Sequence, residues 1–217
     1  MKIFLDTSDV DIIRKHCETG LIDGVTTNPT LMMQAGKNPV KVISDISSLF
    51  ESDASISAEV VADSAEEMIT QAEQYYSIND NITIKVPCNY EGLKACRVLS
   101  SKDINVNVTL IFSLNQSILA AKSGATYISP FIGRCEDNDI DGIDLISSIR
   151  KIFNLNNITK THILAASIRN IDHINDSYKA GAHIVTLPPK IFEGMYKHFL
   201  TDQGLAQFDK DWKELNK

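Results

Sequence analysis

Short apolar segments alternate with helical stretches along the whole 217-residue chain, and this alternation limits the possible folds most strongly. A helix after each strand returns the chain to the same end of the sheet, so the strands must run parallel. Eight such strands with their helices predict an α/β fold, the (β/α)8 TIM barrel. The predicted strands cover residues 2–6, 24–27, 55–61, 82–86, 104–110, 126–130, 162–166 and 183–187.

An open, doubly wound sheet is the alternative arrangement of alternating strands and helices. That fold usually carries a glycine-rich nucleotide loop after its first strand. Here Thr7, Ser8 and Asp9 follow the first strand, and the sequence contains neither a G-x-G-x-x-G motif nor a P-loop. No linker or low-complexity segment interrupts the pattern. We therefore expect a single domain over residues 1–217, with a C-terminal helical arm over residues 201–217.

Composition and charge narrow the possible partners and location. The net charge of −7 disfavours nucleic acid as the main partner, although a few local arginines can still bind a small anion. No segment approaches the roughly 18 consecutive apolar residues of a membrane span, so we expect no membrane partner. The first apolar run is too short for a secretory signal, and the four cysteines lack metal or redox spacing. We expect a cytoplasmic protein with reduced thiols.

Residue parity along the middle strands indicates which side chains face the barrel interior. Alternate residues of a barrel strand face the helices and the lumen. The apolar parity, such as Val106, Val108 and Leu110 on the fifth strand, suits contact with the helices. The opposite parity then points inward, where branched apolar residues normally pack, and it comprises Ser57, Glu59, Thr83, Lys85, Asn105, Asn107 and Thr109. A polar interior on three successive strands indicates a functional site.

Lys85 is the reactive candidate in this set. It stands in a segment over residues 82–87 in which every other side chain except Thr83 is apolar. Burying an ammonium group is costly, which favours the neutral amine, and a neutral amine can attack a carbonyl. Taken alone, the segment also fits an edge-strand lysine that points to water.

Further polar residues fall at the carboxyl ends of the predicted strands, where barrel enzymes place their active sites. They are Asp6, Asn28, Ser129 and Ser167. Simpler explanations exist for single members, because Asp6 can cap the next helix and Asn28 can form a turn. Thr109 is a common strand residue, and Glu59 can be a structural partner that only neutralises Lys85. The argument for a site rests on the whole set.

Six segments, in order along the chain, resemble motifs of the transaldolase family. They are LDTS at residues 5–8, GVTTNP at 24–29, IKVP at 84–87, NVTLIFS at 107–113, ISPFIGR at 128–134 and AASIR at 165–169. The resemblance extends from residue 1 to about residue 199. The short chain resembles the compact branch of the family, which includes the fructose-6-phosphate aldolases.

The resemblance implies catalytic roles for four residues. Lys85 would be the Schiff-base lysine that attacks the ketose carbonyl, and Asp6 the acid–base group of carbon–carbon bond cleavage. Glu59 and Thr109 would position a water molecule that moves protons while the imine forms and hydrolyses. This chemistry requires no metal and no other cofactor, because the protonated imine itself accepts the electrons of the broken bond.

The resemblance also implies how a sugar phosphate would bind. Asn28 and Ser129 would hold substrate hydroxyls or the imine region. Arg134, Ser167 and Arg169 would bind the phosphate, for which the planar fork of arginine is well suited. The alternative for the two arginines is a surface salt bridge.

Two positions distinguish the branches of the family. By resemblance, transaldolases carry Glu at the water-holding position and Phe beside the substrate, whereas the aldolases carry Gln and Tyr. Glu59 and Phe131 therefore favour a transaldolase, which moves a dihydroxyacetone unit from fructose 6-phosphate to erythrose 4-phosphate in the pentose phosphate pathway. The alternatives are a fructose-6-phosphate aldolase, which releases dihydroxyacetone and glyceraldehyde 3-phosphate, and a phosphosugar-binding barrel without turnover.

The C-terminal arm carries apolar residues at helical spacing: Leu205, Phe208, Trp212 and Leu215. A helix with this pattern can pack on its own barrel. The resemblance implies instead an arm that covers a neighbouring subunit of a homo-oligomer, a ring-like pentamer or decamer. A tryptophan so near the chain end favours the second interpretation, because its large apolar surface needs a partner.

The acidic segment DNDIDG at residues 137–142 begins like an EF-hand calcium loop. The match fails at the last ligand position, where Ser148 replaces the bidentate glutamate. We expect a solvated acidic loop that leads into the next helix, and no metal site.

Overall fold

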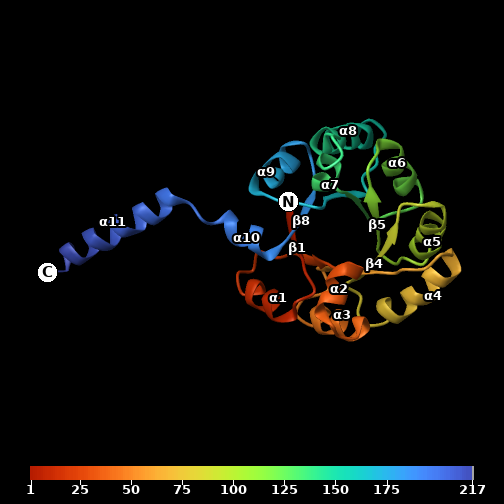
Figure 1. Ribbon diagram of the computed structural model, residues 1–217, viewed down its shortest axis with the longest axis horizontal. Coiled ribbons are helices and arrows are strands. Elements are labelled where there is room, and N and C mark those ends of the chain that lie inside the picture. The colour runs from red at the N-terminus through yellow and green to blue at the C-terminus, as the bar shows by residue number, and fades with distance from the viewer. Residues whose placement is uncertain (217) are drawn as a thin grey trace.

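The computed structural model describes residues 1–216, and its centre is a closed barrel of parallel strands (Figure 1). Within these residues eight strands follow one another around the barrel in chain order, and β1 pairs with β8 to close it. The strands are β1 Lys2–Asp6, β2 Gly24–Thr26, β3 Ser55–Glu59, β4 Ile82–Pro87, β5 Val106–Ile111, β6 Tyr127–Pro130, β7 His162–Ala165 and β8 Ile184–Leu187. The predicted (β/α)8 TIM barrel is confirmed, and the doubly wound alternative is wrong.

Helices join the strands and surround the barrel (Figure 1). They are α1 Val10–Cys17, α2 Pro29–Ala35, α3 Pro39–Ser47, α4 Ala65–Tyr76, α5 Tyr90–Ser100, α6 Leu114–Lys122, α7 Ile132–Glu136, α8 Gly142–Leu155, α9 Ile171–Lys179, α10 Pro189–Met195 and α11 Phe199–Leu215. Short polar side chains start most of them; Ser64, Asn89 and Ser113, for example, each accept a backbone N–H of the first turn. Such caps satisfy N–H groups that the helix itself leaves unpaired.

The strand β5 departs from the predicted alternation. Parity predicts that Leu110 faces the helices together with Val108, but Leu110 has a φ of 60° and is only half-buried. The register between β5 and β6 shifts between Val108 and Ile111, and Ile111 takes the buried outward position. An irregularity of this kind breaks the period of two and re-aims neighbouring side chains. It directly follows Thr109, a candidate site residue.

The barrel has two apolar regions. The larger fills the space between the strands and the helices. The smaller contains Phe4, Leu164, Ala166 and Ile184, with Tyr127 and Phe131 packed against it. The rings of Phe4 on β1 and Tyr127 on β6 meet at 6.2 Å, so this cluster crosses the lumen. Gly24 makes room for it, because a Cβ there would lie 2.9 Å from the Phe4 ring and 2.4 Å from the Ser55 carbonyl oxygen.

The last helix, α11, extends away from the barrel (Figure 1). None of its described residues is buried, and Phe208 and Trp212 are 71% and 67% exposed. The interpretation that this helix packs on its own barrel is therefore wrong. The arm was predicted to reach Lys217, which lies outside the described residues, and the single-domain assignment stays a prediction. Neither α11 nor any other helix within residues 1–216 is both long and apolar enough to cross a membrane.

Candidate active site

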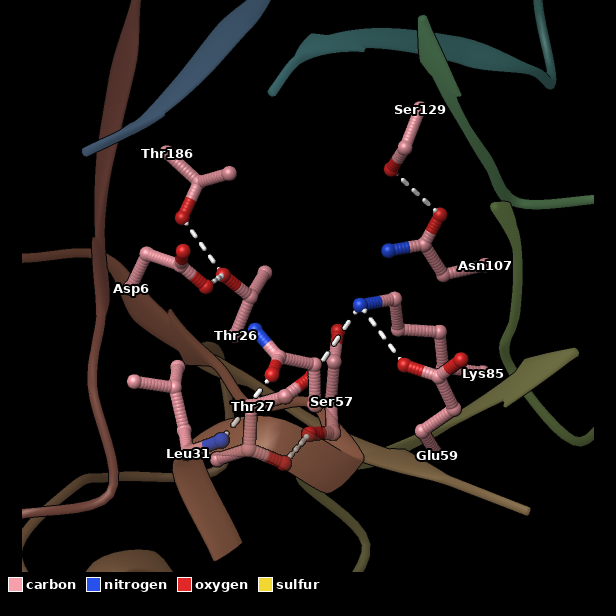
Figure 2. Close-up of polar contacts among 11 residues, drawn as sticks. Asp6, Thr26, Thr27, Leu31, Ser57, Glu59, Lys85, Asn107, Ser129 and Thr186 are labelled. Atoms are coloured by element: carbon pink, nitrogen blue, oxygen red, sulfur yellow. Dashed lines mark hydrogen bonds and ion pairs between the residues drawn. The ribbon is translucent and has the colours of Figure 1, made fainter. Parts of the chain in front are cut away.

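Lys85 projects from β4 into the barrel lumen (Figure 2). Because β4 is hydrogen-bonded to β3 on one side and β5 on the other, the residue does not lie on an edge strand. Lys85 is only 5% exposed, so the interpretation of a solvated lysine is wrong. Its Nζ donates a hydrogen bond to the carbonyl oxygen of Thr27 at 3.0 Å, and lies 3.0 Å from Oε2 of Glu59.

Glu59 reaches the amine because it is the register partner of Lys85 across β3 and β4. The Glu59 side chain is 14% exposed, so the ion pair is largely withdrawn from water. Removing both charges from water is costly, and their attraction offsets part of that cost. The same contact gives the lysine ammonium a carboxylate that can accept its proton. The geometry fits both a structural pair and a proton-transfer pair.

Asp6 lies at the end of β1, and its side chain faces the same lumen (Figure 2). Its Oδ1 accepts a hydrogen bond from the Thr26 hydroxyl at 2.8 Å, and that hydroxyl also contacts the Thr186 hydroxyl at 2.6 Å. Burial raises the pKa of the Asp6 carboxyl, although the Lys85 ammonium and the Thr26 hydrogen bond both lower it. The carboxyl is thus easier to protonate than an ordinary aspartate, as suits a group that takes up a proton during a reaction.

Further buried polar groups line the lumen around Lys85. Ser129 on β6 donates a hydrogen bond to Oδ1 of Asn107 at 2.8 Å (Figure 2). Among the described residues, Nδ2 of Asn107, Oγ1 of Thr109 and Oγ of Ser57 are buried without a hydrogen-bond partner. Such groups are rare in folded proteins, because each costs about 1–3 kcal/mol when it is left unpaired. Three of them around one lysine indicate a place built for a polar ligand.

Phe131 and Arg134 lie at the rim of this polar lumen, just after β6. The Arg134 guanidinium carbon lies 5.0 Å from the centroid of the Phe131 ring, a distance typical of a cation–π contact. The Phe131 ring also packs edge-on against Phe112, with the centroids 5.9 Å apart. The ring of Phe131 is thereby fixed between the lumen and an exposed cation.

Ser167 and Arg169 follow β7 at the same end of the barrel. Ser167 has a φ of 59°, a left-handed conformation that costs a residue with a side chain about 1–3 kcal/mol and that is common at functional sites. Arg169 forms a bidentate ion pair with Asp137, in agreement with the salt-bridge alternative for this arginine. The guanidinium lowers the pKa of the Asp137 carboxyl. Arg169 is therefore paired, whereas Arg134 lies against an aromatic ring.

Asn28 performs the structural role that the simpler interpretation gave it. Its Oδ1 accepts the backbone N–H of Leu31 at 3.0 Å and caps α2. The residue also lines a cavity of about 430 Å³ that extends from Glu59 toward α2 and Tyr75 of α4. A small ligand fits a space of this size. The side chain can cap the helix through its oxygen and still offer its amide N–H groups to the cavity.

Sequence reasoning missed Thr26 and Thr186, the two hydroxyl groups next to Asp6. Both occupy the inward parity of their strands, β2 and β8. Extending the parity argument from the three middle strands to these two would have found them. The missed residues matter because Thr26 is the hydrogen-bond partner of the Asp6 carboxylate.

The acidic loop after α7 is occupied by other interactions. Asp137 pairs with Arg169, and Asp141 accepts the backbone N–H of Asp144 to cap α8. Within residues 1–216 no group of three His, Cys, Asp or Glu side chains is arranged to hold a metal ion. The loop therefore caps the first turn of α8 and supplies the carboxylate that pairs with Arg169.

Comparison with known proteins gives matches over almost the full length of the chain. A family model described as transaldolase/fructose-6-phosphate aldolase matches residues 3–217. A probable transaldolase of Paracoccus denitrificans is 50% identical over 212 residues, covering 98% of this chain and 96% of the relative. A probable transaldolase of Parvibaculum lavamentivorans is 48% identical over 214 residues, covering 99% of this chain and 97% of the relative.

A solved structure supports the fold from a more distant comparison. A mutant flavocytochrome b2 with benzoylformate superposes with a TM-score of 0.63 at 10% sequence identity, covering 87% of this chain and 57% of that chain. At an identity this low, the superposition supports only the shared barrel architecture. The family model and the relatives at about half identity carry the assignment. By both of these matches, the chain belongs to the transaldolase/fructose-6-phosphate aldolase family.

Proposed function

We propose that this protein is a transaldolase that transfers a dihydroxyacetone unit from fructose 6-phosphate to erythrose 4-phosphate through a Schiff base on Lys85. The observation that carries the proposal is a buried lysine amine that shares a polar lumen with two carboxylates. A reaction that breaks a carbon–carbon bond beside a carbonyl needs an electron sink, and a protonated imine is one. Membership in the family makes this reaction, or the related aldol cleavage, the first candidate.

The first chemical step is imine formation. The attacking group is the neutral amine, so the ammonium of Lys85 must first give up a proton, and Oε2 of Glu59 is 3.0 Å away to receive it. The nitrogen then bonds to the ketose carbonyl carbon, and the carbonyl oxygen leaves as water. We assign the positioning of water in this step to Glu59 and Thr109. The Thr109 hydroxyl, buried without a partner among the described residues, suits that role.

The second step is cleavage. We assign to Asp6 the removal of the proton from the substrate hydroxyl on the carbon that becomes the aldehyde. The electrons of the broken carbon–carbon bond move into the protonated imine, and the aldehyde leaves. The raised pKa of the Asp6 carboxyl favours its taking up a proton. Reversal of the same steps with another aldehyde completes the transfer.

The remaining side chains suit a sugar phosphate. We assign to Asn28 and Ser129 the binding of substrate hydroxyls or of the imine region. We assign the binding of the phosphate to Arg134, Ser167 and Arg169. A phosphate must compete with Asp137 for Arg169, since that carboxylate already forms two hydrogen bonds to the guanidinium. A phosphate dianion carries more charge than a carboxylate and also prefers the arginine fork, which makes the exchange favourable.

Phe131 and Glu59 favour transfer over release. A phenyl ring at the rim of the lumen has no hydroxyl that can protonate the carbanionic intermediate, so the dihydroxyacetone unit stays on Lys85 until an acceptor aldehyde binds. Fructose-6-phosphate aldolase activity is the second candidate, because the same lysine and aspartate serve both reactions. A binding barrel without turnover is a third, and it differs by forming no covalent adduct.

The exposed arm supports a proposal about assembly. We assign to α11 the role of packing on a neighbouring subunit of a homo-oligomer, a ring-like pentamer or decamer by resemblance to the family. An apolar face that includes Phe208 and Trp212 stands free of its own barrel, and faces of this kind usually mark an interface. The pentose phosphate pathway and a cytoplasmic location stay predictions.

A first prediction concerns Lys85. Borohydride reduction in the presence of fructose 6-phosphate should add mass to the peptide that contains Lys85, because reduction traps the imine. The variant Lys85→Met should form no adduct and lose turnover, while Lys102→Met, which removes an exposed lysine, should behave as the wild type. Peptide mass spectrometry measures the adduct. An unmodified Lys85 at saturating substrate contradicts both enzymatic candidates.

A second prediction concerns Asp6. Asp6→Asn should lower turnover by about 100- to 10,000-fold, the usual contribution of a general acid–base group, yet still form the borohydride adduct. Asp53→Asn, at an exposed position, serves as the control.

The same variant should be more stable than the wild type at neutral pH. Because the folded-state pKa of Asp6 is raised, its protonated form contributes stability at acid pH that is lost as the pH rises through that pKa. The gain from Asp6→Asn in the free energy of unfolding should therefore shrink on acidification. Urea denaturation at several pH values measures it, and a gain independent of pH contradicts the assignment.

A third prediction concerns the partition between the two reactions. Phe131→Tyr should release more free dihydroxyacetone per turnover, because the added hydroxyl can protonate the intermediate. Phe199→Tyr, on the exposed arm, should leave the ratio unchanged. Assays of dihydroxyacetone with and without erythrose 4-phosphate measure the ratio. An unaltered ratio in Phe131→Tyr removes this residue as the determinant.

A fourth prediction concerns the arm. A double variant with Phe208→Glu and Trp212→Glu should sediment as a smaller species than the wild type, since two charges would enter an apolar contact. Lys210→Glu changes the charge of an exposed neighbour on the same helix and serves as the control. Sedimentation velocity measures the size. A wild-type protein that sediments as a monomer contradicts the proposed assembly.

A further inference from the structure

A second cavity lies at the opposite mouth of the barrel, where the strands begin. Its volume is about 450 Å³. Lys2 at the start of β1, His162 at the start of β7 and His183 just before β8 line it, together with Arg150 from α8. The chain's N-terminus lies beside the start of β8 (Figure 1). The cavity is separate from the candidate active site, because the cluster around Phe4 crosses the lumen between them.

The charged side chains that line this cavity, Lys2 and Arg150, are both positive. Two histidines also line it, and the lining contains no carboxylate. Among the described residues, neither Lys2 nor Arg150 forms an ion pair. The nearby carboxylate of Asp23 is engaged with the backbone N–H of Ile3 at 2.8 Å. In a chain with a net charge of −7, this local excess of positive charge attracts anions.

The hydrogen bonds of His183 leave one donor without an acceptor. The backbone N–H of Ile163 donates to Nδ1 of His183 at 2.9 Å. Arg150 Nη1 contacts the other ring nitrogen, Nε2. Arginine is only a donor, and a neutral imidazole accepts at only one of its two nitrogens, so one of these two N–H donors lacks an acceptor on the ring. Burial and the Arg150 charge lower the pKa of His183 to about 4, which keeps the ring neutral at physiological pH.

The position of Arg150 depends on the turn after α9. Gly181 has a φ of 100°, and a Cβ there would lie 2.6 Å from Cγ of Arg150. The glycine thus lets the aliphatic part of the arginine cross the turn and bring the guanidinium to His183. Tyr127 and Tyr178 also line the cavity, and the Tyr178 hydroxyl donates to the carbonyl oxygen of Lys2 at 2.7 Å.

We propose that this cavity is a binding site for a small phosphorylated anion, with one phosphate oxygen accepting from both Arg150 and the Nε2–H of His183. Lys2 adds a second positive charge beside the phosphate. A tetrahedral dianion suits this set because it offers several acceptor oxygens to donors that come from different directions. The cavity is larger than a phosphate group, and its tyrosine walls suit the organic part of a phosphate ester.

Titration of the protein with inorganic phosphate, followed by NMR of the histidine rings, tests the site. The chain has five histidines, and two of them report on opposite mouths. His183 reports on the proposed site, and His173 reports on the Arg169 loop, because its Nδ1 lies 3.4 Å from the Arg169 backbone N–H. We expect a saturable shift of the His183 signals and a rise of its pKa, since an anion stabilises the protonated ring. A His183 ring that stays unmoved up to saturation of the His173 signals overturns the proposal.

Matched variants identify the groups responsible. Arg150→Gln should weaken phosphate binding at His183 by at least about tenfold, the usual loss for a charge-assisted hydrogen bond. Lys2→Gln, at an exposed position that folding does not require, should cause a smaller loss and provides a test that does not depend on Arg150. Arg97→Gln removes the same charge from exposed α5 and should have no effect. Equal losses in Arg150→Gln and Arg97→Gln would mean diffuse attraction by the surface and would overturn the site.

Comparing the binding of inorganic phosphate with that of glycerol 3-phosphate distinguishes a site for free phosphate from a site for a phosphate ester. Tighter binding of the ester at His183 supports a site for a phosphorylated metabolite, with the organic part against the tyrosines. Equal binding of both supports a site for the phosphate group alone. Neither outcome bears on the borohydride adduct at Lys85, so the two proposals succeed or fail separately.

Discussion

The cost of holding a lysine amine inside a closed barrel governs the part of the lumen around Lys85. A closed barrel has no strand edge through which Lys85 can reach water, and its amine is held by the Thr27 carbonyl and the Glu59 carboxylate instead. Each partner must itself be buried and satisfied, which brings further polar residues into a space that most barrels fill with branched apolar side chains. Within the polar lumen, the Thr27 carbonyl and the Glu59 carboxylate are the groups that hold the buried charge of Lys85.

The same barrel separates two environments along its axis. Around Lys85 the lumen is polar, and below it the rings of Phe4 and Tyr127 meet across an apolar cluster that requires glycine at position 24. This cluster separates the polar residues around Lys85 from the cationic cavity at the other mouth. A molecule with excess negative charge therefore carries a locally positive cavity at the mouth where the strands begin.

Asp6 and Ser167 both adopt states that reduce the stability of the fold. The buried Asp6 carboxyl is destabilised in its charged form, and Ser167 adopts a left-handed backbone that a side chain makes unfavourable. The surrounding barrel supplies the stability that allows both, through the large apolar layer between strands and helices. Arg169 illustrates a different restraint, because its pairing with Asp137 keeps a cation in place that would otherwise be mobile at the surface.

The fold class, the order of the elements and most of the inward polar set could be predicted from the sequence, because strand parity and helical spacing are local properties of the chain. Asn105, which was predicted to face inward, is exposed and precedes β5. The sequence correctly predicted that Lys85 and Glu59 face the same interior. The pairs that these groups form required the three-dimensional structure: Asp6 with Thr26, Arg169 with Asp137 and Asn28 with the start of α2. It also placed the irregularity at Leu110 and the contact of Arg150 with His183. Those outcomes depend on barrel closure, register and competition between neighbouring groups, which bring together residues that no local pattern relates.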